Sequence, residues 1–289
     1  MIKKIYTFGT SFTHGGGFEW NSLSSDVNEK LETNYGHIDI PKNQFDCSWP
    51  GFLQRYLGDD VKVTNFAKSG FGNELIYRKV FDLVTSSDFK KDECLLLLEF
   101  SFMMRKEVFI KELDDYIICN YHFRDNNSLC DTHVMGLRYY YDSDETMEVL
   151  DKHRQLLWDY MNITMTEDNI IKELNRDMFY ILSLLDKLGI NYLTTSSPLI
   201  PEDLIELTNY SENNKIYYQK DNIVTEYLED YIRDCKLSIS DETEGKYDDW
   251  HGGLIGNREV AKQVYNQLIN KKLISGKRKK LDFTPLTII

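Results

Sequence analysis

The stretch Cys94-Leu-Leu-Leu-Leu-Glu-Phe100 is almost continuously apolar. Such a run is typical of a strand that is covered on both faces within a parallel sheet. Two shorter β-rich runs precede it, Ile2 to Phe8 and Val61 to Ala67, and helical patterns follow each of them at Ser48–Gly58 and Asn73–Val84. The alternation of strands and helices predicts an α/β fold of the doubly wound type.

The second half of the chain continues this alternation. Glu167 to Leu188 is a strongly periodic helix with Thr166 as its expected N-cap, and Ile190 to Thr195 is the next strand. Two further helices are expected, one near Ile223 to Arg233 and one over Ile255 to Lys271. Together these elements predict a flavodoxin-like, mostly parallel sheet of about five strands that is flanked by helices.

A long stretch separates the strand ending at Phe100 from the periodic helix. It holds two β-like runs, Tyr116 to Phe123 and Leu137 to Tyr141, and a helical segment over about Glu145 to Met161. Because connections of this length are uncommon, we interpret residues 107–165 as an inserted hairpin plus helix that caps the sheet's carboxyl edge. Residues 1–275 then form one domain with this insertion, and residues 276–289 form a C-terminal tail.

Composition excludes several classes of function. The formal net charge of −13 and a pI near 5.0 disfavour binding to nucleic acid. No segment has the apolar length of a membrane span or signal peptide, so we expect a cytoplasmic protein, and one encoded by a phage and released by lysis would look the same. The five cysteines form no CxxC pair, and no metal-ligand spacing is present. We therefore expect no metal and no cofactor.

Ser11 lies where the first strand ends, within Phe8-Gly-Thr-Ser-Phe-Thr13. Ligands of open α/β sheets bind at the carboxyl ends of the strands, so this hydroxyl is a candidate nucleophile. The alternative is that Ser11 only caps a helix.

His251 opens the last predicted helix within Tyr247-Asp-Asp-Trp-His-Gly-Gly253. A serine hydroxyl needs a base to take its proton, and the imidazole needs an acceptor on its other nitrogen. Asp248, three residues before His251, can provide that acceptor. The alternative is an ordinary surface histidine.

These segments resemble the motifs of the SGNH/GDSL hydrolase family, in the family's order. Gly9-Thr-Ser-Phe12 resembles its first block, with Thr in place of Asp and Phe in place of Leu, and Asn65-Phe-Ala-Lys-Ser-Gly70 is similar to its second. Asp248-x-x-His251 resembles its last block. Ser48-Trp-Pro50 and Gly70-Phe-Gly-Asn73 resemble a branch seen in phage and bacterial members. The resemblance implies a Ser11–His251–Asp248 triad, with the Gly70 amide as an oxyanion donor.

The third block departs from the family pattern. Its Asn, which donates to the oxyanion, is absent from Ser101-Phe-Met-Met104. Loss of one such donor costs about a hundred- to a thousand-fold in rate. Three interpretations are open: Asn73 supplies the amide, which we favour; Ser101 or Arg105 supplies a donor; or the site is catalytically weakened.

The resulting hypothesis is a serine esterase acting on small O-acyl esters, including acetyl esters of carbohydrate, with His14 and Trp250 near the substrate. Its expected partner is a small-molecule or carbohydrate ester, with no nucleic acid and no membrane. A rival hypothesis is a non-catalytic SGNH-fold module for binding or virion structure. A nucleotide-binding domain is a third, for which no phosphate-loop motif is present. The sequence does not give the oligomeric state.

Overall fold

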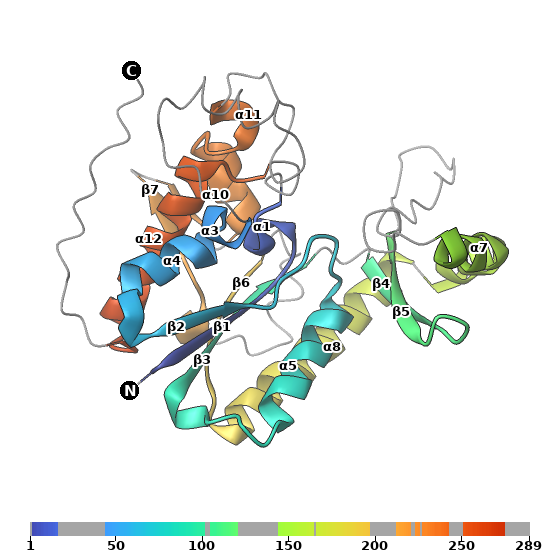
Figure 1. Ribbon diagram of the computed structural model, residues 1–289, viewed down its shortest axis with the longest axis horizontal. Coiled ribbons are helices and arrows are strands. Elements are labelled where there is room, and N and C mark those ends of the chain that lie inside the picture. The colour runs from blue at the N-terminus through green and yellow to red at the C-terminus, as the bar shows by residue number, and fades with distance from the viewer. Residues whose placement is uncertain are drawn as a thin grey trace.

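The computed structural model describes residues 2–16, 44–101, 105–120, 144–164, 166–196, 212–220, 223–225, 227–242 and 251–274. Its centre is a parallel sheet with the strand order β2-β1-β3-β6, visible edge-on in Figure 1. The strands are β1 (Lys4–Phe8), β2 (Lys62–Asn65), β3 (Cys94–Phe100) and β6 (Asn191–Ser196). The predicted doubly wound, flavodoxin-like fold is confirmed.

The sheet has four strands in the described residues, where about five were expected. Beside β6, the described residues form isolated parallel bridges, Thr194 with Lys215 and Ser196 with Tyr227. In the part of the chain that the structure describes, these bridges stand where a fifth strand was expected.

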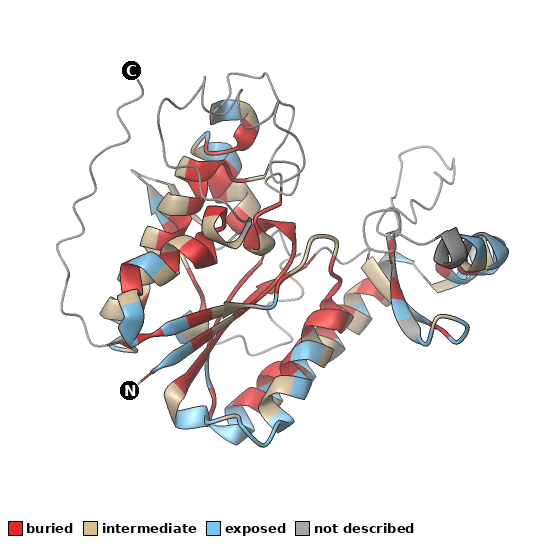
Figure 2. Ribbon diagram, viewed as in Figure 1, coloured by how far each residue is buried: buried red, intermediate tan, exposed pale blue. Residues whose placement is uncertain are grey.

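Helices cover both faces of the sheet. On one face lie α4 (Trp49–Leu57) and α12 (Leu254–Asn270), and on the other lie α5 (Asn73–Thr85) and α8 (Glu167–Leu188). Successive β3 residues point alternately into the two cores, which is why the whole strand is buried (Figure 2). The β3 side chains in the α4/α12 core are Leu95 and Leu97, and those in the α5/α8 core are Leu96, Leu98 and Phe100.

The caps of α4 and α8 follow from the sequence. The Ser48 hydroxyl accepts a hydrogen bond from the Gly51 amide at 3.4 Å, and the Thr166 side chain does the same for Asn169. The helix α8 ends at Gly189, which has a φ of 65° that favours glycine. These signals place both helices where the sequence predicts them.

The predicted helix over Ile223–Arg233 is wrong in its first half. Ile223–Thr225 is a strand, β8, that pairs antiparallel with β7 (Tyr218–Lys220), and the helix α10 begins only at Leu228. The three residues of β8 are all β-branched, which favours extended backbone over helix. The remaining short helices are α1 (Ser11–His14), α3 (Gln44–Cys47), α10 (Leu228–Asp234) and α11 (Ile239–Glu242), with 3₁₀ turns at Gly58–Asp60, Lys91–Glu93 and Glu212–Asn214.

The insertion contains a hairpin and a helix, as predicted. The hairpin joins β4 (Arg105–Ile110) to β5 (Asp115–Asn120), and the helix is α7 (Asp144–Thr164). The Tyr116 run therefore pairs with β4. The expected second run, Leu137–Tyr141, lies outside the described residues. The insertion shares a separate small core with the start of α8, formed by Ile110, Ile117, Cys119, Leu157, Met161 and Ile170. Its described part extends away from the sheet rather than over it (Figure 1).

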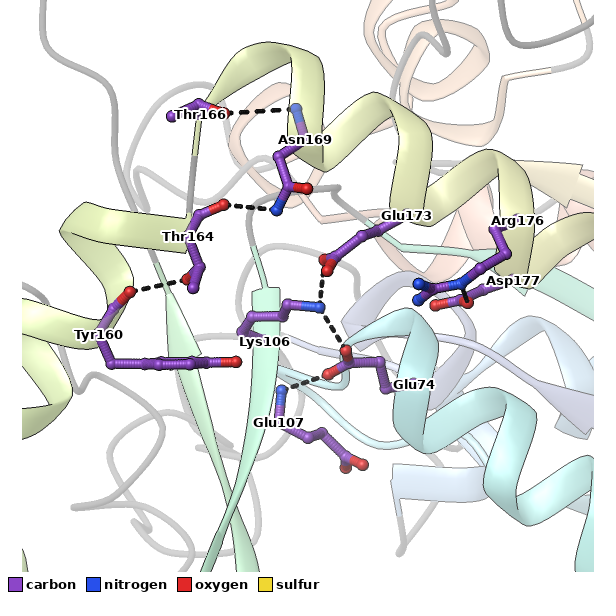
Figure 3. A network of polar contacts seen from close by, with 10 residues as sticks. All are labelled: Glu74, Lys106, Glu107, Tyr160, Thr164, Thr166, Asn169, Glu173, Arg176 and Asp177. Atoms are coloured by element: carbon purple, nitrogen blue, oxygen red, sulfur yellow. Dashed lines mark hydrogen bonds and ion pairs between the residues drawn. The ribbon is translucent and has the colours of Figure 1, made fainter.

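Ion pairs tie β4 to the helices of the main domain. The Lys106 ammonium lies 2.6 Å from a Glu74 carboxylate oxygen of α5 and also contacts Glu173 of α8 (Figure 3). Burial acts to lower the pKa of Lys106, but its hydrogen bonds to Glu173 and Glu74 outweigh burial and raise it. Beside it, Arg78 of α5 holds Glu107 at 3.0 Å. The charged residues of β4 give it no apolar pattern that would identify it as a strand from the sequence. The same residues form the ion pairs that hold β4 to α5 and α8.

Candidate active site

Ser11 is the first residue of α1, directly after the turn that ends β1. Its side chain lies at the carboxyl edge of the sheet, and the residue is 7% exposed. Its carbonyl oxygen accepts hydrogen bonds from the amides of Gly15 and Gly16, at 3.0 Å and 2.6 Å. Ser11 is therefore held on a tight turn at the position predicted for a nucleophile.

His251 meets Ser11 from the other end of the chain. The distance from its Nε2 atom to Ser11 Oγ is 2.7 Å, across a separation of 240 residues. Its ring lies against Phe12, with 5.0 Å between the ring centroids. Its backbone is fixed by the start of α11, because the amide of Ile239, the first residue of that helix, donates to the His251 carbonyl at 2.8 Å. The structure thus brings Ser11 and His251, from two motifs far apart in the sequence, into contact.

Gly16 packs directly against this pair. A Cβ atom on Gly16 would lie 2.8 Å from Ser11 Cβ, 2.9 Å from His251 Cδ2 and 3.0 Å from His251 Nε2. These distances are shorter than van der Waals contact, so any side chain here would displace the serine or the imidazole. In the sequence, the run Gly15-Gly-Gly17 is the one signal that a residue without a side chain is needed beside Ser11 and His251.

A buried polar connection joins the two halves of the site through α4. The Trp49 indole N–H donates to Thr13 Oγ1 at 3.1 Å, and the Trp49 backbone N–H donates to Asn257 Oδ1 at 2.9 Å. The Asn257 amide in turn donates to the carbonyl of Gly252, the neighbour of His251, at 2.5 Å. Trp49 and Asn257 therefore fix the α1 turn and the His251 loop relative to each other. Sequence reasoning missed both roles.

The loop after β2 is docked onto α1. The Asn65 amide donates to the Thr13 carbonyl at 3.0 Å, and the Ser69 backbone N–H donates to His14 Nδ1 at 3.3 Å. Because a backbone N–H can only donate, His14 Nδ1 acts there as an acceptor. Gly70 has a φ of 81°, in the left-handed region that favours glycine. His14 thus contacts this loop, and its predicted substrate contact stays a prediction.

Asn73 is hydrogen-bonded at both ends of its amide to the residue that follows β3. Its Oδ1 accepts from the Ser101 N–H at 2.7 Å and its Nδ2 donates to the Ser101 carbonyl at 3.0 Å. The Ser101 hydroxyl donates its single proton to the Phe71 carbonyl at 2.6 Å. Arg105 Nη1 also donates to that carbonyl, at 3.2 Å. Of the three candidate donors, Ser101 therefore has its hydroxyl proton engaged by the Phe71 carbonyl, and Asn73 Nδ2 carries a second hydrogen besides the one that it donates to Ser101.

Asp248 and Trp250 lie outside the described residues, so their predicted roles stay predictions. Among the described carboxylates, Glu229 of α10 interacts electrostatically with His251. Burial, and secondarily the neighbouring Asp230, raise the pKa of Glu229. Within the described part of the chain, no group of three or more His, Cys, Asp or Glu side chains could hold a metal ion, and no helix is long and apolar enough to cross a membrane.

The fold and the Ser11–His251 contact define an α/β protein with a hydroxyl–imidazole pair at the carboxyl edge of its sheet. Neither a protein-family model nor a curated protein matches the chain. Among solved structures, it is similar to a protein from Desulfitobacterium hafniense DCB-2 that is assigned to the G-D-S-L family of lipolytic proteins. The two share 12% identity with a TM-score of 0.32, over 92% of this chain and 99% of that one. The fold assignment rests on the sheet order and not on this likeness.

Proposed function

We propose that the protein is a serine esterase of the SGNH/GDSL type that hydrolyses small O-acyl esters. The observation that carries this proposal is the 2.7 Å contact between Ser11 Oγ and His251 Nε2. A hydroxyl within hydrogen-bond reach of an imidazole nitrogen, on a tight turn at a strand end, is the arrangement that nucleophilic acyl transfer requires.

In this mechanism Ser11 attacks the ester carbonyl while His251 Nε2 takes its proton. The imidazolium then gives this proton to the leaving alcohol, which leaves an acyl-enzyme at Ser11. Water attacks the acyl-enzyme with His251 again as base, and the acid is released. Asp248 is the proposed acceptor for the Nδ1 proton, where it would stabilise the imidazolium.

The proposed oxyanion donors are the backbone N–H groups of Ser11 and Gly70, with Asn73 as the third. Asn73 Nδ2 carries two hydrogens, and the Ser101 carbonyl takes one of them. The second is the one proposed for the oxyanion, with Arg105 as the alternative donor. The engagement of Asn73 by Ser101 at both ends is also the observation that favours the rival proposal, a catalytically weakened SGNH-fold module.

Labelling with a fluorophosphonate probe tests the nucleophile directly. The wild type is expected to be labelled at Ser11 and to hydrolyse p-nitrophenyl acetate, and Ser11→Ala should lose both while it stays folded. His251→Gln should slow labelling by about 10²–10⁴-fold, the usual contribution of general base catalysis. Ser86→Ala, which removes an exposed serine at the end of α5, is the matched control and should react as the wild type does.

The two proposals separate on these results. Labelling that depends on His251 rejects the non-catalytic module. If the folded wild type is neither labelled nor active on short esters, the esterase proposal is rejected and the proposal of a non-catalytic module remains. Comparison of p-nitrophenyl acetate with an acetylated sugar and a long-chain ester then tests the substrate class.

A further inference from the structure

Glu99 is a buried carboxylate beside the candidate nucleophile that the mechanism above does not use. It is 1% exposed and lies near the end of β3, next to the turn between β1 and α1. Its Oε1 accepts a hydrogen bond from the Thr10 hydroxyl at 2.6 Å, and its Oε2 accepts one from the Thr10 N–H at 3.2 Å. Both contacts converge on the residue that precedes Ser11.

The turn is built around this carboxylate. A Cβ atom on Gly9 would lie 2.3 Å from Glu99 Oε2 and 2.8 Å from Glu99 Cβ. Gly9 therefore leaves the space that Glu99 fills, and Thr10 supplies two donors to it. Every other residue of β3 is apolar, and a buried carboxylate costs several kcal/mol unless it is well paired. A strand that served only the core would have an apolar residue at this position.

Thr10 uses its hydroxyl in an unusual way. It is the N-cap residue of α1, a position where a threonine oxygen ordinarily accepts from a helix amide. Here the side chain makes no capping hydrogen bond and donates to Glu99 instead. With its N–H and its hydroxyl both fixed, Thr10 has little freedom to rotate, and the peptide that links it to Ser11 is fixed with it.

We propose that Glu99 is a positioning residue for Ser11, which holds the Thr10–Ser11 peptide so that the hydroxyl meets His251 and the Ser11 N–H faces the oxyanion. This inference rests on the proposed esterase function. Fully buried Tyr218 of β7 is a further titratable group close to Glu99: burial raises its pKa, and the Glu99 charge adds to this.

Two substitutions separate the contacts of Glu99 from its charge. Glu99→Gln keeps the length of the side chain, with its carbonyl accepting from the Thr10 N–H and its amide donating to the Thr10 hydroxyl. Glu99→Leu removes both contacts. Thr10→Val removes only the hydrogen bond from the Thr10 hydroxyl to Glu99. It replaces Glu99→Leu as the test if Glu99→Leu does not fold. Glu107→Leu is the matched control, because this carboxylate is also buried and paired, with Arg78, but lies in β4 away from Ser11.

The first readout is the rate of fluorophosphonate labelling per folded molecule, together with kcat and KM for a short ester. We expect Glu99→Leu to lose at least about 30-fold in labelling rate and in kcat with KM nearly unchanged, since a misplacement of about 1 Å can cost 10²-fold. Glu99→Gln should retain the rate within about tenfold, since it keeps both contacts. Glu107→Leu should lower stability without changing the rate per folded molecule. A Glu99→Leu or Thr10→Val protein that reacts at the wild-type rate overturns the proposal.

The second readout does not depend on activity. Crystal structures of the variants should show Ser11 Oγ and His251 Nε2 beyond hydrogen-bond distance in Glu99→Leu, but in contact in Glu99→Gln. If the wild type proves inactive, the esterase proposal fails, and this distance still decides whether Glu99 positions Ser11. An unchanged Ser11–His251 contact in Glu99→Leu overturns the positioning role whatever the activity.

Discussion

Gly16→Ala is the most direct test of how closely the candidate site is packed. The new methyl carbon would lie 2.8 Å from Ser11 Cβ and 2.9 Å from His251 Cδ2. Carbon atoms pack at about 3.5–4.0 Å, so each contact is too short by roughly 0.6 Å or more. The serine and the imidazole must move apart, and their 2.7 Å hydrogen bond must lengthen.

The expected effect on rate follows from this displacement. A shift of about 1 Å between reacting groups can cost 10²-fold, so the labelling rate of Ser11 and kcat on a short ester should fall by about that factor. Overpacking should also cost about 1–3 kcal/mol of stability. For a domain of this size that lowers Tm by about 2–4 °C per kcal/mol, so Gly16→Ala stays folded at 25 °C.

Gly189→Ala is the control for the loss of stability. Its φ of 65° strains any residue with a Cβ, but the residue follows α8 and precedes β6, at the amino edge of the sheet, whereas Ser11 lies at the carboxyl edge. We expect a comparable decrease in Tm, measured by differential scanning fluorimetry, with an unchanged labelling rate. If Gly16→Ala is labelled within about threefold of the wild-type rate, a far smaller loss than displacement predicts, the argument from packing is refuted.

Three further substitutions test the supporting contacts. Asn257→Leu leaves buried amide and carbonyl groups without partners and should lower the free energy of unfolding by about 2–5 kcal/mol, measured by urea denaturation; a loss below about 1 kcal/mol would contradict the connection through α4. Because burial raises the pKa of Glu229, the folded state binds that proton more tightly, and its stabilisation is lost as the pH rises through the folded pKa. Glu229→Gln should therefore raise Tm more at pH 7 than at pH 4, and an equal shift at both would refute this. Lys106→Met leaves the carboxylates of Glu74 and Glu173 facing each other and should speed hydrogen exchange of the β4 and β5 amides before that of β3; uniform protection would show that the ion pairs do not anchor the insertion.

Much of the fold could be predicted because local signals and tertiary packing agree. The helix α8 begins after Thr166 and ends at Gly189 as its caps predict, and β3 spans the whole apolar run from Cys94 to Phe100. Each of these elements is long enough for periodicity or composition to identify it. The wrong assignment at Ile223–Thr225 concerns three residues, too few for a period to be visible, and their pairing with β7 decides their conformation.

The candidate site was predictable only in part. Ser11 and His251 stand in recognisable motifs, but the residues that hold them act through contacts between distant segments. Glu99 stood out only as the single polar residue of an apolar strand, and Asn257 sits inside an ordinary helical pattern. Spacing along the chain carries no information on which backbone groups an amide or carboxylate will meet.

The separation of 240 residues between Ser11 and His251 has a consequence for folding. Neither the first sheet strands nor the last helix can form the pair alone. Under the proposed esterase function, reactivity at Ser11 therefore requires a chain whose two ends have docked. The rate of probe incorporation is then a measure of completed assembly, to be followed during refolding alongside the faster formation of helices. Intermediates that hold β1 in place without α12 would be compact, spectroscopically ordered and unreactive.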